Sequence, residues 1–420
     1  MPERFIIKGT KPLEGVVEIP GYKNSAGACL AASLLTEEEV ILDNLPLVED
    51  VFKMIKVLES MGVKTQWLGE RKISLRAEEI FPEKMNFGPI SETRVSVLLI
   101  GSLLSRLGNF RICHPGGDRI GVRPIKTHLE ALKALGVKIK SDDDFYIFKL
   151  DNLKGKEIVL KEFSVTATEN LMMAAIRAPG KTLIKGAAAE PQVQDLGFLL
   201  KKMGARIAGL GTNTILIEGV DKLKGAYHKI IPDLLEAGTF IVAGALSPGE
   251  IEVRNIMPEH LDIFLDKLKE IGVNFKKGSN FIRVKYSPKL KAVRVQALPY
   301  PGFQTDLLPI IIPLLTQAEG KSLVHDPLYE NRFNYVQELK KMGADIEIVD
   351  PHRAFVYGKV PLRGLRIESW DIRAGASLVI AGLIAKNCTT IDNIYQIDRG
   401  YEKIDEKLKK LGADIRRINN

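Results

Sequence analysis

One short phrase recurs six times along this chain of 420 residues. It begins with leucine and ends in a glycine followed by valine or alanine, and five of the copies carry lysine in between. A lysine in the last turn and a glycine at the end are typical of a helix C-terminus. Even spacing over so many copies indicates an internal repeat. The glycines lie 68 to 74 residues apart, at Gly62, Gly136, Gly204, Gly272, Gly343 and Gly412.

A second kind of helix is predicted before each copy of the phrase. These segments are apolar nearly all round, as buried helices are, whereas the helix that ends at the glycine, such as 50–61, is amphipathic. Short strands are predicted between the two helices, for example 40–42 and 389–391, and further strands after each glycine. The pattern predicts six α/β units, and the length predicts two domains. The predicted buried helices are 24–35, 95–104, 170–176, 239–246, 307–315 and 374–385.

Composition excludes several classes of protein. Three cysteines, Cys29, Cys113 and Cys388, are too few and too scattered for a disulfide framework, which favours a reducing compartment. The first residues lack the apolar region of a signal peptide, and the apolar run 307–315 is too short to span a bilayer. We therefore expect a cytoplasmic protein with no membrane partner. Net charge is +8, but lysines are spread out and aromatic residues make up 7%, so we expect no nucleic-acid partner. An anionic small substrate explains the excess charge equally well.

The loop 115–124 is rich in glycine and lies between a predicted strand, 109–113, and a predicted helix, 124–135. Pro124 suits the first position of that helix, and Arg123 would stand at its N-terminus, where free N–H groups favour an anion. Asp118 is a single carboxylate close to two arginines. The loop suits a phosphorylated or carboxylated ligand, and the alternative interpretation is a turn with solvated charges.

Polar residues gather at the predicted starts of the buried helices and in the turns before the amphipathic helices. If the units share an orientation, these ends converge, and two domains of three units would enclose a cleft lined by helix N-termini. For Asp233 and Thr305 the better interpretation is helix capping. Five cations recur at these positions and favour an anion site, although each alone would be an ordinary surface charge: Lys23, Arg94, Arg123, Arg373 and Arg399.

From about residue 5 to 418 the chain resembles the UDP-N-acetylglucosamine 1-carboxyvinyltransferase family, the enolpyruvyl transferases that begin peptidoglycan synthesis. The motifs that carry the resemblance are residues 21–25, 115–124, 167–170, 300–306, 330–333, 371–374 and 397–401. The resemblance implies a two-domain inside-out α/β barrel with three units in each domain. One domain would be 22–231, carrying the 115–123 catalytic loop, and the other 1–21 with 232–420, with the active site in the cleft between them.

The resemblance also implies a reaction. The enolpyruvyl group of phosphoenolpyruvate passes to the 3′-hydroxyl of UDP-N-acetylglucosamine through a tetrahedral intermediate, and phosphate leaves. Asp118, Asp306, Lys23 and Arg399 would be catalytic, with Asp306 the base for the hydroxyl. Phosphoenolpyruvate would contact Lys23, Asn24, Arg123, Arg373 and Arg399. The UDP-sugar would contact Asn24, Arg94, Arg123, Pro124, Ile125, Lys126, Thr127, Ser164, Val165, Asp306 and Leu328.

Neither a metal nor another cofactor is implied. We interpret His128 as a structural hydrogen-bonding residue, and the alternative interpretation is a helper in the reaction. Asp118 departs from the family pattern, because most members carry cysteine there, and the thiol is the group that fosfomycin alkylates. Since a carboxylate is a poorer nucleophile, we predict fosfomycin resistance. Glu162 and Thr166 also depart from the pattern, near the expected nucleotide contacts.

Two alternatives remain from the sequence. The first is 3-phosphoshikimate 1-carboxyvinyltransferase, which shares the fold and the donor but whose usual asparagine-alanine-glycine-threonine motif is missing here. The second is a non-catalytic protein that binds nucleotide-sugars or other anions. We expect a monomer or a weak homo-oligomer.

Overall fold

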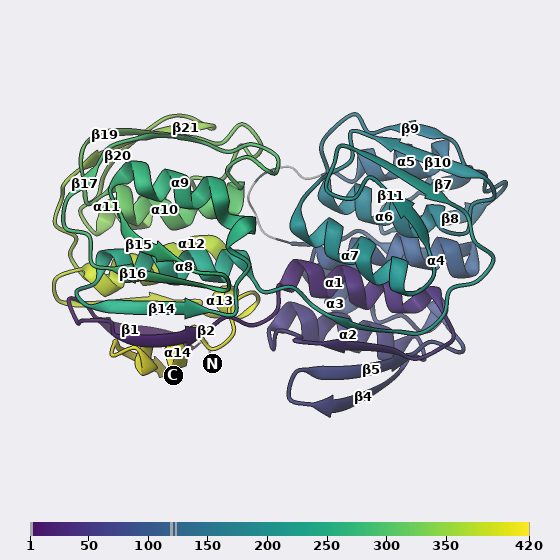
Figure 1. Cartoon of the computed structure of the whole chain (residues 1–420), viewed down its shortest axis with the longest axis horizontal. Helices are drawn as coiled ribbons and strands as arrows, with labels where there is room; N and C mark the ends of the chain where they lie inside the picture. Colours follow the sequence, from purple (N-terminus) through teal and green to yellow (C-terminus); the bar gives the residue numbers. More distant parts are fainter. Residues whose placement is uncertain (1–2, 118–120, 122–123, 420) are drawn as a thin grey trace. The chain divides into compact units, whose positions relative to one another are not determined.

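The computed structural model describes residues 3–117, 121 and 124–419. Asp118 and Arg123 of the predicted site therefore lie outside the described residues. The chain divides into two compact units (Figure 1). Among the described residues, unit 1 consists of residues 3–20, 121 and 232–419, and unit 2 consists of residues 21–117 and 124–231.

The described strands form six sheets, three in each unit, and the sheets share one strand order. In each sheet a central strand pairs antiparallel with both of its neighbours, and in five sheets a further strand pairs parallel at one edge. In unit 2 the strands are β13(Ala226–Lys229)-β3(Val40–Asp43)-β5(Lys72–Arg76)-β4(Lys64–Gly69), β6(Asn109–Cys113)-β8(Phe145–Leu150)-β7(Val137–Ser141) and β9(Glu157–Val159)-β10(Lys181–Lys185)-β12(Thr214–Glu218)-β11(Arg206–Ala208).

Unit 1 contains the first strand of the chain at the centre of its last sheet. β1 lies between β23 and β24, so that Phe5 pairs with both Ile391 and Arg417. The sheets of unit 1 are β2(Gly15–Glu18)-β14(Glu250–Arg254)-β16(Phe281–Lys285)-β15(Asn274–Lys277), β17(Leu290–Lys291)-β19(Ala318–His325)-β21(Arg353–Gly358)-β20(Asp345–Asp350) with β18(Arg294–Gln296) also on β19, and β22(Arg366–Glu368)-β23(Cys388–Asp392)-β1(Arg4–Lys8)-β24(Asp414–Ile418).

Six helices are buried almost completely, which confirms the prediction from their apolar sequences. In unit 1 the helices α8, α10 and α12 pack against one another, and in unit 2 α4 packs against both α1 and α6. Four of these helices begin earlier than predicted, and the difference is largest at Val165 and Leu234, where Ser164 and Asp233 cap the helices. The buried helices are α1(Lys23–Ala32), α4(Leu99–Leu107), α6(Val165–Ala175), α8(Leu234–Leu246), α10(Leu308–Leu315) and α12(Ile372–Ile384).

The other helices include those that end at the repeated glycines. Each of the six glycines has a positive φ, between 97° and 107°, which confirms their role at helix C-termini. The helix predicted from Pro124 begins instead at Lys126, because the backbone of Ile125 (φ −94°, ψ 20°) is not helical. These helices are α2(Glu49–Ser60), α5(Lys126–Ala134), α7(Pro191–Lys202), α9(Asp262–Ile271), α11(Val336–Lys341) and α14(Ile404–Lys410), with the short α3(Phe87–Glu92) and α13(Tyr395–Asp398) elsewhere.

Close backbone packing holds the buried helices of unit 2 together. A side chain at Gly101 of α4 would meet the backbone oxygen of Asn170 in α6 at 2.3 Å. The Asn170 amide also bridges these segments, since its Oδ1 accepts from the Gly101 N–H at 2.7 Å and its Nδ2 donates to the Val97 carbonyl at 3.0 Å. The motif 167–170 therefore has a structural role.

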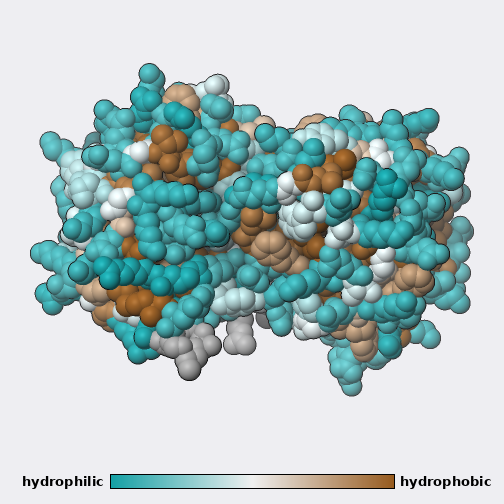
Figure 2. Space-filling view, turned by 90° about the horizontal axis from the view of Figure 1, so that it is seen from below, coloured by the Kyte–Doolittle hydropathy of each residue, from teal (hydrophilic) through white to brown (hydrophobic). Residues whose placement is uncertain are grey.

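Figure 2 shows hydrophilic residues over most of one face, with apolar residues in separate patches. Among the described residues, none of the helices combines the length and the apolar character that crossing a bilayer requires.

We expect Gly204→Ala to destabilise the protein by about 1 kcal/mol, because an L-residue at positive φ is strained. The site isolates this effect, since φ is 105° and a new Cβ would meet nothing within 4 Å. Gly69→Ala is the control, because its Cβ would also have space, with 3.8 Å to the nearest atom, and its φ is not in the left-handed region. Thermal unfolding should show a lower Tm only for Gly204→Ala, and equal Tm values would contradict the prediction.

Candidate active site

The first turn of α1 holds a buried lysine. Lys23 is 6% exposed, and its Nζ lies 2.8 Å from the Asp50 carboxylate, which is 2% exposed in the first turn of α2. An unpaired charge would be very unfavourable at this depth, so the ion pair decides where the ammonium group lies. Asn24 donates from Nδ2 to the hydroxyl of Tyr22 at 3.1 Å. Unit 2 therefore presents a cation and an amide at the start of one helix.

A second group of predicted residues joins the starts of α5 and α6. Thr127 donates to Glu162 at 3.2 Å, and Nε2 of His128 lies 2.9 Å from the hydroxyl of Thr166. Ser164 caps α6 by accepting from the Ala167 N–H. Glu162 and Thr166, which depart from the family pattern, thus serve as side-chain partners here. The remaining predicted residues of this region are exposed Pro124, buried Ile125, exposed Lys126 with Nζ 3.9 Å from Glu130, and Val165 as the first residue of α6.

The electrostatics of this region keep His128 neutral. The pKa of His128 is lowered to about 3, mainly by burial and to a smaller extent by the positive charge of Arg94. The structure therefore supports a hydrogen-bonding role for His128. Arg94 is therefore close enough to the start of α5 for its charge to act on His128.

In unit 1, three charged residues meet at the starts of buried helices. Asp306 lies in the short 3₁₀ helix Thr305–Leu307 before α10, and Arg373 lies in the first turn of α12. Nη2 of Arg332 donates to Oδ1 of Asp306, while Nε of Arg373 lies 3.7 Å from Oδ2. The Asp306 carboxylate is thus oriented by two guanidinium groups yet remains 31% exposed. It is the accessible member of a largely buried charge cluster.

Arg332 is the centre of this cluster and was not among the predicted site residues. It is 2% exposed, and its Nε donates to Thr305 at 3.1 Å and lies 3.5 Å from Asp326. Burial alone would lower the pKa of Arg332, but the neighbouring carboxylates raise it above its ordinary value. Its place in the motif 330–333 was the signal that could have identified it. Asp326 is fully buried and carried no such signal, because only the fold brings it to Thr305.

The capping predictions for Asp233 and Thr305 had different outcomes. Asp233 accepts from the N–H groups of Leu235 and Glu236, which confirms it as the cap of α8. The prediction for Thr305 was wrong, because its hydroxyl donates to Asp326 and accepts from Arg332.

Arg399 and Leu328 complete the predicted residues of unit 1. Arg399 follows α13, is 6% exposed and donates to Gln396 at 3.0 Å. Leu328 follows β19 and is exposed, and its N–H donates to Asp326 at 2.9 Å. The guanidinium of Arg373 also lies over the ring of Tyr401, 5.1 Å from its centroid. Unit 1 therefore combines buried cations with one accessible carboxylate, an arrangement suited to a small anionic ligand and to proton transfer.

The fold brings together one set of metal-ligand types that the sequence spacing did not indicate. Potential ligand atoms of Cys29, Asp195 and His228 lie within 4.8 Å of one another. The hydrogen bonds do not fit a metal site, because Nζ of Lys202 lies 3.2 Å from Nδ1 of His228 and can only donate. Nδ1 is therefore the acceptor, and the protonated Nε2 points at Asp195, 2.8 Å away. A histidine ligand would instead need a free nitrogen lone pair directed at the ion.

Comparison with known proteins defines the class. The family model of EPSP synthase (3-phosphoshikimate 1-carboxyvinyltransferase) matches residues 7–408. The fold is similar to that of the enolpyruvyl transferase NikO from Streptomyces tendae, with a TM-score of 0.90 at 24% identity over 100% of this chain and 99% of that one. It is also similar to EPSP synthase from Acinetobacter baumannii, with a TM-score of 0.73 at 19% identity over 100% of both chains. The protein is thus an α/β protein of the EPSP synthase family and has the fold of the enolpyruvyl transferases.

Relatives with higher identity narrow the class. The chain is 44% identical to UDP-N-acetylglucosamine 1-carboxyvinyltransferase of Koribacter versatilis, over 99% of this chain and 96% of that protein. It is 46% identical to the enzyme of the same name from Halothermothrix orenii, over 99% of each. Within the EPSP synthase family, the chain belongs to the UDP-N-acetylglucosamine 1-carboxyvinyltransferases and is a transferase.

We expect acid to destabilise the protein through His128. The unfolded side chain titrates near its ordinary value of about 6.5, whereas the folded one titrates at about 3, so stability is complete above about pH 6.5 and falls as the pH falls toward 3. At pH 5 the loss should be about 2 kcal/mol. The difference in Tm between pH 7.5 and pH 5 should therefore shrink in His128→Gln, whose amide can still bond to Thr166. An unchanged difference would contradict the prediction.

Proposed function

We propose that the protein transfers the enolpyruvyl group of phosphoenolpyruvate to the 3′-hydroxyl of UDP-N-acetylglucosamine and releases phosphate, the first committed step of peptidoglycan synthesis. The observation that carries this proposal is the near full-length similarity to transferases of that name. The buried charges support it, because Lys23, Asp306, Arg373 and Arg399 each have a chemical task that suits their surroundings.

Phosphoenolpyruvate carries a carboxylate and a phosphate, so its site must be cationic. Lys23, Arg373 and Arg399 are 4–6% exposed, and buried cations attract anions more strongly than solvated ones do. With Arg123, which lies outside the described residues, they would form the cradle for the donor. We propose that residues of both units act on the same pair of substrates.

The acceptor hydroxyl must lose a proton as its oxygen attacks C2, while C3 gains a proton. Asp306 is the proposed base. Arg332 and Arg373 contact its two carboxylate oxygens and hold them in place, and the hydroxyl proton would pass to Asp306 as the forming C–O bond makes the hydroxyl more acidic. Asp118 would serve proton transfer at C3 or product release. Phosphate then leaves from the tetrahedral intermediate as C3 loses a proton, which restores the double bond.

We also propose that the chain consists of six copies of one unit, arranged as two inside-out α/β barrels of three units each. Each copy would hold a buried helix, a strand, an amphipathic helix and two more strands. The shared strand order and the six glycine-ended helices support this interpretation. The domains would be 22–231 and 1–21 with 232–420, in a protein of the cytoplasm that is a monomer or a weak homo-oligomer.

Acceptor-dependent phosphate release separates the candidate functions. With phosphoenolpyruvate we expect phosphate release on adding UDP-N-acetylglucosamine and none on adding shikimate 3-phosphate. The reverse result would establish the activity of a 3-phosphoshikimate 1-carboxyvinyltransferase, which the named relatives do not favour. If no phosphate is released with either acceptor but the protein binds the UDP-sugar, the result would indicate a non-catalytic binding protein.

Two variants test the residues. Asp306→Asn keeps the shape of the side chain but removes the base, and should lower kcat by about 10² or more. Lys23→Met combined with Asp50→Asn removes both buried charges, so that neither is left unpaired, and should abolish turnover without unfolding the chain. Turnover close to that of wild type in either variant would remove that residue from the proposed mechanism.

Fosfomycin tests the residue at position 118. A carboxylate opens the epoxide far more slowly than a thiolate does, so the wild-type protein should keep its activity after incubation with fosfomycin. Asp118→Cys should be inactivated in a time-dependent way, with a mass increase of one inhibitor molecule. The native Cys113 is the internal control, because its thiol is half-buried and burial raises its pKa. Rapid modification of the wild-type protein would contradict the prediction.

A further inference from the structure

Asp195 is a buried carboxylate to which the proposed chemistry gives no task. It lies in α7, is 3% exposed, and accepts hydrogen bonds from three separate segments of unit 2. The hydroxyl of Ser25 and the backbone N–H of Ile231, the latter at 3.3 Å, donate to Oδ2. Nε2 of His228 lies 2.8 Å from Oδ1. One carboxylate therefore joins α1, β13 and the segment that follows β13.

These contacts brace the first turn of α1 from two sides. Ser25 directly follows Lys23 and Asn24, so its bond to Asp195 restrains the turn from within. Ile231 restrains it from outside, because its carbonyl accepts from the backbone N–H of Tyr22, the N-cap residue of α1, at 2.7 Å. Ile231 is also the last residue of unit 2 before the chain continues into unit 1.

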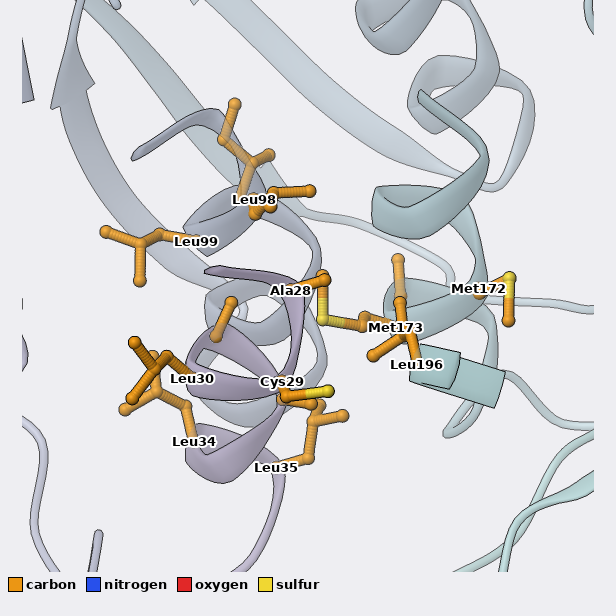
Figure 3. Close-up of a cluster of buried hydrophobic side chains, with 14 of the residues drawn as sticks. Ala28, Cys29, Leu30, Leu34, Leu35, Leu98, Leu99, Met172, Met173 and Leu196 are labelled. Atoms are coloured by element: carbon orange, nitrogen blue, oxygen red, sulfur yellow. The ribbon is translucent and has the colours of Figure 1, made fainter. Parts of the chain in front are cut away.

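The histidine in this network has a defined tautomer. Lys202 donates to Nδ1, so the proton is on Nε2 and is directed at Asp195. Figure 3 shows the sulfur of Cys29 directed toward the side of α1 on which Leu196 of α7 lies. Asp195, His228 and Ser25 are buried, whereas Lys202 is exposed, so the network connects the surface with the start of α1.

We propose that Asp195 is a positioning residue, which holds the first turn of α1 so that Lys23 and Asn24 are in place for the enolpyruvyl donor. The proposal rests on the proposed function, because that function gives Lys23 and Asn24 their task. A purely structural Asp195 would also contribute to stability. It would not change the apparent affinity for one substrate.

The decisive variant is Asp195→Asn combined with a change at Lys202. Asparagine fits the space, but in either orientation its NH₂ meets a donor, the Nε2–H of His228 or the Ile231 N–H, and the ring cannot exchange tautomers while Lys202 donates to Nδ1. We expect Asp195→Asn to raise KM for phosphoenolpyruvate about tenfold or more, with a smaller change in kcat. Lys202→Met alone should keep the wild-type KM. The double variant Asp195→Asn/Lys202→Met should recover most of the loss, because the ring is then free to accept from the amide.

A matched pair of serines controls for stability. Ser25 and Ser33 lie in one continuous helical segment, both are at most 1% exposed, and each hydroxyl donates one hydrogen bond, the latter to the Leu30 carbonyl at 2.7 Å. Ser25→Ala should raise KM for phosphoenolpyruvate, and Ser33→Ala should change only the Tm. If Asp195→Asn does not fold, the comparison of Ser25→Ala with Ser33→Ala still tests the proposal.

The proposal is overturned if Asp195→Asn and Ser25→Ala lower the Tm but leave KM within about twofold of wild type. Absence of recovery in the double variant also counts against it. If the wild-type protein releases no phosphate with either acceptor, the proposed function fails separately. Hydrogen exchange at the Tyr22 and Ile231 amides then decides the bracing role: faster exchange in Asp195→Asn than in Ser33→Ala supports it, and equal rates refute it.

Discussion

A buried cation must have a carboxylate partner, and the candidate site depends on this requirement. Lys23 can be buried because it forms an ion pair with Asp50 in the next helix. Arg332 can be buried because it forms ion pairs with Asp306 and Asp326. The same contacts that satisfy these charges also orient them. Lys23 and Arg332 thus keep carboxylate partners in the apolar interior, close to residues that we propose to bind a polyanionic substrate.

The cations can be held so deeply because the helices behind them are apolar on every side. In unit 1, α8 is buried at every residue, and it packs with α10 and α12. Their first turns carry the caps Asp233 and Asp371 and, beside α10, the acid Asp306. Burial of the helix bodies stabilises the fold, while the carboxylates of Asp233 and Asp371 accept hydrogen bonds from the first N–H groups of α8 and α12. The polar residues of these helices therefore gather at the helix starts, where we propose that the ligand binds.

Two buried polar side chains of unit 2 each connect several segments of the chain. Asn170 joins two buried helices through its amide, and Asp195 joins three segments through one carboxylate. Both residues contribute little apolar contact. Their value lies in specifying which segments meet, because a buried polar group tolerates few alternative arrangements.

The elements that local chemistry controls could be predicted from the amino-acid sequence. The glycine-ended helices, the buried helices and β6 over 109–113 follow from backbone preferences and from apolar patterning, which act over a few residues. The motif residues Lys23, Asp306, Arg373 and Arg399 were also recognisable, although their joint action on one substrate remains a proposal. The tertiary structure alone decided the partners. Asp50 for Lys23, Asp326 for Thr305 and Asp195 for Ser25 lie 27, 21 and 170 residues away along the chain, and only packing brings them close. It also decided that Thr305 binds Asp326 and Arg332 instead of capping a helix, because a pattern of neighbours in sequence carries no information about which charges share a buried space.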